Sequence, residues 1–133
     1  MCSSDLLGGW PPAYEATYEW QCLQAPLPDL RVFVHVTDTA GRTVAQQDHS
    51  PHAGWFPTIK WRAGDVLRKR YVWVLPATLP GGRYQIRIGW FGAERTGRLP
   101  VSTPNAGDGE DRAIVAQLDV PPPPRYAWFG VSR

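Results

Sequence analysis

The sequence has no apolar run that approaches the roughly 18 to 20 residues needed to cross a bilayer. Its N-terminus also lacks the basic segment followed by an apolar one that marks a secretion signal. The 133 residues suit one domain, with no room for a catalytic domain beside a binding domain. This segment itself is therefore expected to make no membrane contact.

A basic stripe is missing as well. The 14 basic residues are interspersed with 12 acidic ones, for a net charge of +2, so no surface is marked for nucleic acid. Thiols are scarce, with two cysteines in all. Cys22 lies in an alternating apolar pattern, where a small buried side chain is a simpler interpretation than a nucleophile or metal ligand.

Glycine and proline are frequent and spread along the chain, with 13 and 14 residues, which argues against long helices. Between them the apolar residues alternate with polar ones, the pattern of half-buried strands. The expected strands cover residues 15–22, 30–36, 42–48, 66–75, 83–91, 98–101 and 112–120. We therefore predict an all-β fold, a two-sheet antiparallel β-sandwich of about seven strands, immunoglobulin- or fibronectin-III-like.

Two turns support this prediction. Asp38 to Gly41 has turn chemistry, with Gly41 suited to a positive φ. Tyr84 follows Pro80 and Gly81 at the start of a strand, the form of a tyrosine corner, in which the hydroxyl donates to a backbone carbonyl a few residues upstream. The alternative for Tyr84 is an ordinary core tyrosine after a turn.

The two ends of the chain differ from its middle. Residues 1–6 (MCSSDL) match the translation of a common sequencing adapter, so we interpret residues 1–7 as a non-native leader. Residues 8–120 are assigned to the sandwich. Residues 121–133 form a proline-rich linker and an aromatic tail, since four consecutive prolines cannot join a central strand.

Residues for catalysis or metal binding are sparse. His49 and His52 beside Asp48 resemble metal ligands, but no further ligand lies at a telling spacing, so we predict no metal site. His35, opposite the valines of its strand, is expected to be a hydrogen-bonded sheet histidine. The sequence has no Gly-x-Ser-x-Gly motif, phosphate loop or dinucleotide fingerprint. We expect no catalytic residue, no cofactor and no enzyme activity.

Aromatic residues are the richer signal, with seven tryptophans, five tyrosines and four phenylalanines. Flat rings pack on the apolar faces of sugars, and neighbouring polar groups orient the ligand. The alternative is that Trp55 and Trp61 close one end of the core, while Trp20, Trp73 and Trp90 lie inside it. The candidate ligand-binding residues are Trp55, Phe56, Trp61, Asp48 and Arg62.

An ordered set of short motifs spans the chain from about residue 14 to residue 120. They are RVFVHVTD at 31–38, Gly41, VAQQD at 44–48, Pro51, PT at 57–58, WRAGD at 61–65, LPG at 79–81, Tyr84, and IG at 88–89. Together they resemble a β-sandwich module found at the C-terminal end of bacterial multi-spanning glycosyltransferases of the mannosyltransferase-like class, and in other surface-associated proteins. The insert at 102–111 and the proline-rich tail depart from that pattern.

The resemblance implies an immunoglobulin-like or carbohydrate-binding-module-like sandwich with no catalytic role. It also implies an extracytoplasmic location, periplasmic or at the cell surface, within a membrane-anchored or secreted parent protein. We therefore expect an accessory domain that contacts glycan, with parent-protein domains upstream as further partners. The alternative is a structural or protein-contact module that packs on its parent enzyme and binds no glycan.

Overall fold

A computed structural model describes residues 2–7, 10–49, 51, 56–92, 97–99 and 111–123. Seven strands and one short 3-10 helix are defined in this part of the chain. They are β1 (Cys2–Leu7), β2 (Ala13–Gln21), β3 (Leu30–Thr37), β4 (Thr43–His49), η2 (Thr58–Lys60), β5 (Val66–Val74), β6 (Gly82–Gly92) and β7 (Ala113–Val120). The predicted all-β fold is confirmed for these residues, which include no helix long and apolar enough to span a membrane.

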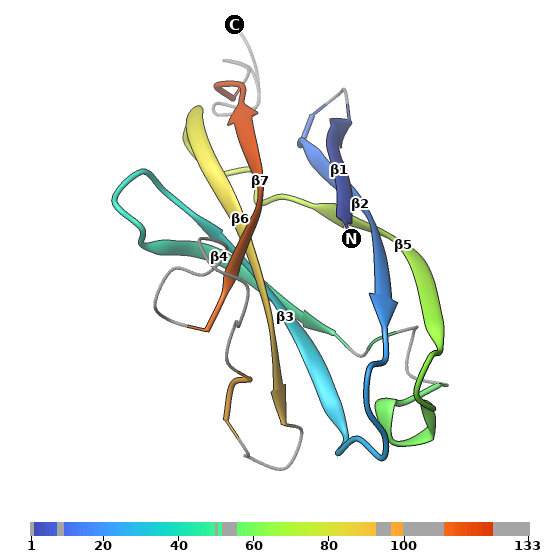
Figure 1. The fold of residues 1–133 in the computed structure, drawn as a ribbon. Helices are drawn as coiled ribbons and strands as arrows, with labels where there is room; N and C mark the ends of the chain where they lie inside the picture. The colour runs from blue at the N-terminus through green and yellow to red at the C-terminus, as the bar shows by residue number, and fades with distance from the viewer. Residues whose placement is uncertain are drawn as a thin grey trace, which may run out of the picture.

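The strands form two antiparallel sheets (Figure 1). One has the order β1-β2-β5 and the other β4-β3-β6-β7. Apolar side chains of both sheets meet in one core, because alternate residues of each strand point to the same face. The core includes Tyr14 and Tyr18 of β2, Val34 of β3, Ile86 of β6 and Leu118 of β7, all at most 6% exposed.

The two predicted turns are confirmed. Gly41 has φ +83°, and the Asp38 carboxylate accepts bonds from the backbone N–H groups of Ala40 (3.0 Å) and Arg42 (2.9 Å). The bond from Arg42 is the main reason that the pKa of Asp38 lies below its usual value. The Tyr84 hydroxyl donates to the Pro80 carbonyl at 2.6 Å, and burial raises its pKa, so it stays a donor. Both turns therefore use local side-chain bonds to hold their backbones.

Two segments differ from the expected strands. Residues 1–7 are interpreted above as a non-native leader; that interpretation stays a prediction, and Cys2–Leu7 pairs with β2 along one edge of its sheet. The strand expected at 98–101 is reduced to a bridge between Arg98 and Phe91, while residues 100 and 101 lie outside the described part.

The outward face of the four-stranded sheet is also partly buried. Phe33 and His35 of β3 are 3% and 6% exposed, although they point away from the core valines. The Arg112 side chain, 2% exposed, lies beside His35, and its Nη1 is 3.1 Å from His35 Nδ1. A guanidinium can only donate, so the Nδ1 atom of His35 is the acceptor of this bond. The expectation of a hydrogen-bonded sheet histidine is confirmed.

Candidate functional site

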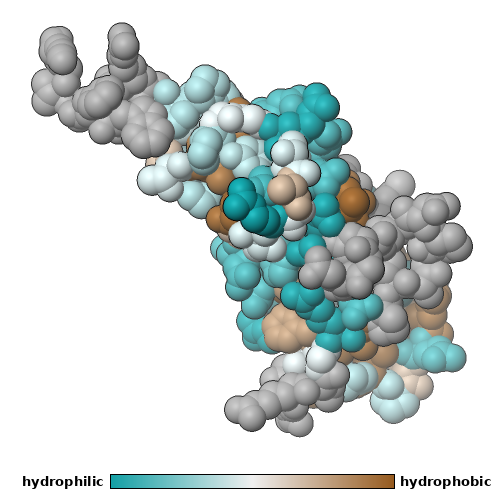
Figure 2. All heavy atoms as spheres, turned by 90° about the vertical axis from the view of Figure 1, so that its left-hand side faces the viewer, coloured by the Kyte–Doolittle hydropathy of each residue, from teal (hydrophilic) through white to brown (hydrophobic). Residues whose placement is uncertain are grey.

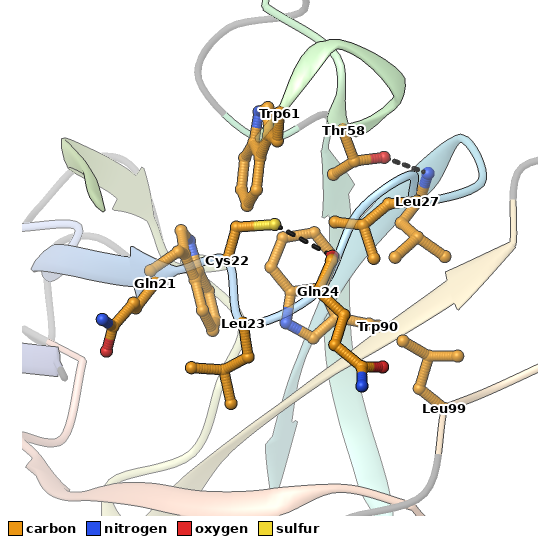
Figure 3. Close-up of a pocket in the computed structure, with 11 residues that line it drawn as sticks. Gln21, Cys22, Leu23, Gln24, Leu27, Thr58, Trp61, Trp90 and Leu99 are labelled. Carbon is orange, nitrogen blue, oxygen red and sulfur yellow. Dashed lines mark hydrogen bonds between the residues drawn. The ribbon is translucent and has the colours of Figure 1, made fainter. Parts of the chain in front are cut away.

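The largest described cavity lies where β2 and β6 end and β3 begins, at the lower end of the molecule in Figure 1. Its volume is about 540 Å³. Figure 3 shows Trp61 and Trp90, with Leu23, Leu27 and Leu99, gathered around this space. The walls come from the ends of β2 and β6, the connection between β2 and β3, and η2, which are far apart in the sequence. We call it the tryptophan cavity.

Three tryptophan rings fix its shape. The centroids of Trp20 and Trp90 lie 4.6 Å apart with the rings inclined at 69°, and those of Trp61 and Trp90 lie 6.0 Å apart at 87°. Such edge-to-face pairs are favoured by the charge distribution of aromatic rings. Trp61 Nε1 donates to the Phe56 carbonyl at 3.0 Å, which sets its orientation. Trp90 thus stands between the other two rings and holds them in place.

A single threonine ties η2 to the wall formed by the β2–β3 connection. Thr58 Oγ1 accepts a bond from Leu30 N at 2.8 Å and donates to the Pro28 carbonyl at 2.6 Å (Figure 3 shows the first bond). Two backbone bonds join the neighbouring turn to Cys22, from Gly64 N at 2.7 Å and to the Asp65 carbonyl at 2.9 Å. These contacts place Trp61 against the end of β2.

We predict that Thr58→Ala lowers the free energy of unfolding by about 1–3 kcal/mol, because the buried Leu30 N–H is left without its acceptor. Urea unfolding followed by tryptophan fluorescence measures the change. Thr58→Ser is the control: it keeps the hydroxyl, loses one methyl group, and should cost about 0.8 kcal/mol. Equal losses for the two variants would contradict the role of the hydroxyl.

The tryptophan cavity is electrically neutral. None of the described residues that line it carries a charge, and its polar side chains include Gln21 and Gln24, both exposed at the rim. Cys22, 3% exposed, donates its thiol to the Gln24 carbonyl at 3.1 Å. In the described part of the chain, no three His, Cys, Asp or Glu side chains are placed to share a metal ion. The chemistry on offer is ring contact and amide hydrogen bonding with an uncharged ligand.

The candidate residues from the sequence are not brought together at one cavity. Trp61 lines the tryptophan cavity but is 4% exposed, which favours the alternative that it closes the end of the core. Phe56 is half-buried and accepts the Trp61 bond, while Arg62 is exposed and its N–H donates to Asp65 Oδ2 at 2.8 Å. Trp55 lies outside the described residues.

Asp48 belongs to a second, smaller cavity. This cavity, of about 310 Å³, lies on the outward face of the four-stranded sheet, where Phe33, His35 and Phe91 line it. The Arg98 guanidinium lies 4.6 Å above the Phe33 ring, a cation–π contact. On the face seen in Figure 2, apolar side chains lie in small separate groups among hydrophilic ones. Because Asp48 lines this second cavity, it does not contribute to the tryptophan cavity.

Sequence reasoning missed Trp20, Trp90, Gln21 and Gln24 as site residues. The alternative interpretation of the aromatic residues places Trp20 and Trp90 inside the core, because they continue the apolar alternation of their strands, and both do pack against it. Their positions could have identified them as cavity residues, because both lie within two residues of a strand end, where the core meets the solvent. A second signal is Leu23, an apolar residue in a proline-containing connection, which is 78% exposed at the cavity.

The chain matches no protein-family model, no curated protein and no solved structure.

Proposed function

We propose that this chain is a non-catalytic accessory domain with an immunoglobulin- or fibronectin-III-like sandwich, and that it contacts carbohydrate at the tryptophan cavity. The division into three and four strands supports the finer fold assignment, because β2 neighbours β5 and β3 neighbours β6, as the B–E and C–F strand pairs do in that fold. The Tyr84 hydroxyl bond at the start of β6 supports it further, since the tyrosine corner occurs at the start of strand F.

The single observation that carries the carbohydrate proposal is the composition of the tryptophan cavity. The half-buried rings of Trp20 and Trp90 meet there beside the buried ring of Trp61, and Gln21 and Gln24 are exposed lining residues. A sugar ring presents an apolar C–H face to the rings and hydroxyl groups to the amides. With no charged side chain among the described lining residues, a neutral sugar is the ligand that this cavity suits.

The non-catalytic part of the proposal rests on the carboxylates. Glycosidases need two of them, about 5 to 9.5 Å apart across the bound sugar. The described lining of the tryptophan cavity has none, and that of the second cavity has Asp48 alone. The proposed extracytoplasmic location, within a larger envelope protein, is supported by the sequence resemblance to glycosyltransferase-associated modules.

Binding to a glycan array of neutral and charged oligosaccharides tests the proposal. We predict saturable binding of neutral glycans, and about fivefold weaker binding by Gln24→Ala, the loss expected from one hydrogen bond worth about 1 kcal/mol. The melting temperature should stay unchanged, because Gln24 is exposed.

Gln46→Ala is the matched control, since Gln46 is an exposed glutamine that lines the second cavity. It should bind as the parent protein does. Absence of binding to any neutral glycan would overturn the proposal, and a larger effect of Gln46→Ala than of Gln24→Ala would move the site to the second cavity.

One observation favours the alternative, a module that contacts protein. Val66, Val72 and Val74 of β5 are 58%, 45% and 59% exposed, on the outward face of the three-stranded sheet. Val72 and Val74 are neighbours on this face, and adjoining exposed apolar side chains are typical of surfaces that bind other chains. The array result separates the two functions, because a module of this second kind retains no sugar.

A further inference from the structure

Among the described residues, β5 is an edge strand whose second side faces no other strand. In the described part of the chain it pairs with β2 and with no other strand. Just beyond the strand ends, Leu75 N donates to the Pro12 carbonyl at 2.8 Å and Cys22 N donates to the Asp65 carbonyl at 2.9 Å. Odd-numbered residues therefore direct their backbone groups towards β2, since these directions alternate along an antiparallel strand.

The even-numbered residues of β5 consequently direct their N–H and C=O groups away from β2, to the open side. They are Val66, Arg68, Arg70, Val72 and Val74, and all five are exposed. Their side chains share the outward face of the sheet, because alternate residues of a strand point to one face. The same five residues thus offer a row of backbone hydrogen-bonding groups and a row of side chains. We call this row the β5 edge.

The charge of the β5 edge indicates what it binds. Arg68, Lys69 and Arg70 are consecutive, so the centre of the strand is basic. Across the sheet, β2 places Glu19 directly opposite Arg68, and Glu15 diagonal to Arg70. The Arg70 guanidinium forms a salt bridge with the Glu15 carboxylate. A neighbouring strand with two acidic residues on the same outward face therefore already lies on one side of these arginines.

A second copy of this chain fits the open side poorly. If two β5 strands pair antiparallel over their full length, Arg70 faces Arg70 of the other copy, and Arg68 lies diagonal to it. Like charges directly opposite one another destabilise such a pair. Basic residues on an edge strand also protect proteins against indiscriminate edge pairing. The β5 edge thus disfavours pairing with the β5 edge of a second copy and favours pairing with an acidic strand.

We propose that the β5 edge is the docking site for an extended segment of a partner polypeptide with two acidic residues at alternate positions. The segment adds a strand to the three-stranded sheet, so its backbone supplies the affinity. Its acidic side chains face Arg68 and Arg70, and apolar side chains cover Val72 and Val74. This inference is independent of sugar binding at the tryptophan cavity.

The test uses the full chain and the capped peptide Val-Thr-Val-Thr-Glu-Thr-Glu-Thr-Val, which places glutamates opposite both arginines in antiparallel pairing. Amide hydrogen exchange by NMR is the readout. The peptide should slow exchange of the Arg68, Arg70 and Val72 amides at least tenfold. The amides of Lys69 and Tyr71, which already face β2, should change little. The same peptide with both glutamates replaced by lysine should bind at least tenfold more weakly.

Three variants sharpen the test. Arg68→Glu leaves one glutamate and one arginine facing the peptide, so it should abolish the preference between the two peptides, while Lys60→Glu, an equal charge change at an exposed residue of η2, should leave it in place. Val72→Pro removes an N–H that points to the open side, a position where an edge strand tolerates proline, and should abolish peptide binding in a folded protein.

Three results would overturn the proposal. They are absence of binding, binding without the alternating pattern of protection, and equal binding of the acidic and basic peptides. Protection of the same amides by self-association, without peptide, would also overturn it, because the occupant would then be a second copy.

Discussion

Replacing Trp90 by alanine should lower the free energy of unfolding by about 3 kcal/mol, the lower end of the range for removing a large aromatic side chain from a core. Trp90 is half-buried, which places it at that end, but its ring contacts both Trp20 and Trp61. Removal leaves both rings without their common partner. Urea or guanidinium unfolding measures the loss, and the proposed sugar binding should disappear with the cavity wall.

Trp90→Phe is the matched control, because it keeps a ring of smaller area in the same position. We expect it to lose less than half as much stability as the alanine variant and to retain weakened sugar binding. If Trp90→Ala costs less than about 1 kcal/mol, the ring cannot be the centre of the cluster. Unchanged sugar binding by a folded Trp90→Ala protein would instead remove the ligand from the tryptophan cavity.

Gly89→Ala should also be strongly destabilising, by about 3 kcal/mol, at the upper end of the usual cost of overpacking. A Cβ atom at Gly89 would lie 2.3 Å from Phe33 Cζ and 2.8 Å from the Asp111 carbonyl oxygen. Gly89 is directly opposite Phe33 in the sheet, and the Phe33 ring lies against its backbone. Neither neighbour can give way cheaply, since Phe33 is 3% exposed and the oxygen belongs to the backbone.

Gly41→Ala serves as the control for Gly89→Ala. No atom lies within 4 Å of a Cβ at Gly41, so its cost of about 1 kcal/mol comes from the left-handed backbone alone, φ +83°. Adding Phe33→Ala should make the Gly89 substitution less costly, because one of the two clashes is removed. Additive effects of the two changes in unfolding experiments would show that the ring is not the obstacle.

Most of the strands could be predicted from the sequence because a strand with one buried face has apolar residues at every second position. Tyr84, Ile86 and Ile88 alternate with Gln85 and Arg87, and the structure buries the first three. The turn at Gly41 and the Tyr84 bond were predictable for the same reason, since each depends on residues only a few positions apart.

The expected strand at 98–101 shows the limit of such patterns. Two or three alternating residues do not distinguish a strand from a single bridge, and Arg98 forms a bridge alone. The outward burial of Phe33 is a further case. Its strand reads as an apolar run, but the run does not reveal that Arg98 lies over the ring or that Gly89 leaves space beneath it.

The candidate site was only partly predictable. The tryptophans were recognised as the informative residues, and Trp61 lies at the largest described cavity, but Asp48 lies at another. Residue spacing along a long loop does not say which strand ends lie beside it. Trp20 and Trp90 are 70 positions apart in the sequence, and packing between the two sheets brings their rings to 4.6 Å.

The sequence by itself determined that the chain is rich in strands, which face of most strands is apolar, and where two turns form. These features depend on the two-residue alternation of a strand and on hydrogen bonds between residues that are only a few positions apart in the sequence. The tertiary structure decided which strands are neighbours, and with that the tryptophan cavity and the open side of β5. Strand pairing joins residues that are distant in the sequence. The alternation of apolar and polar residues within one strand does not identify which other strand pairs with its edge.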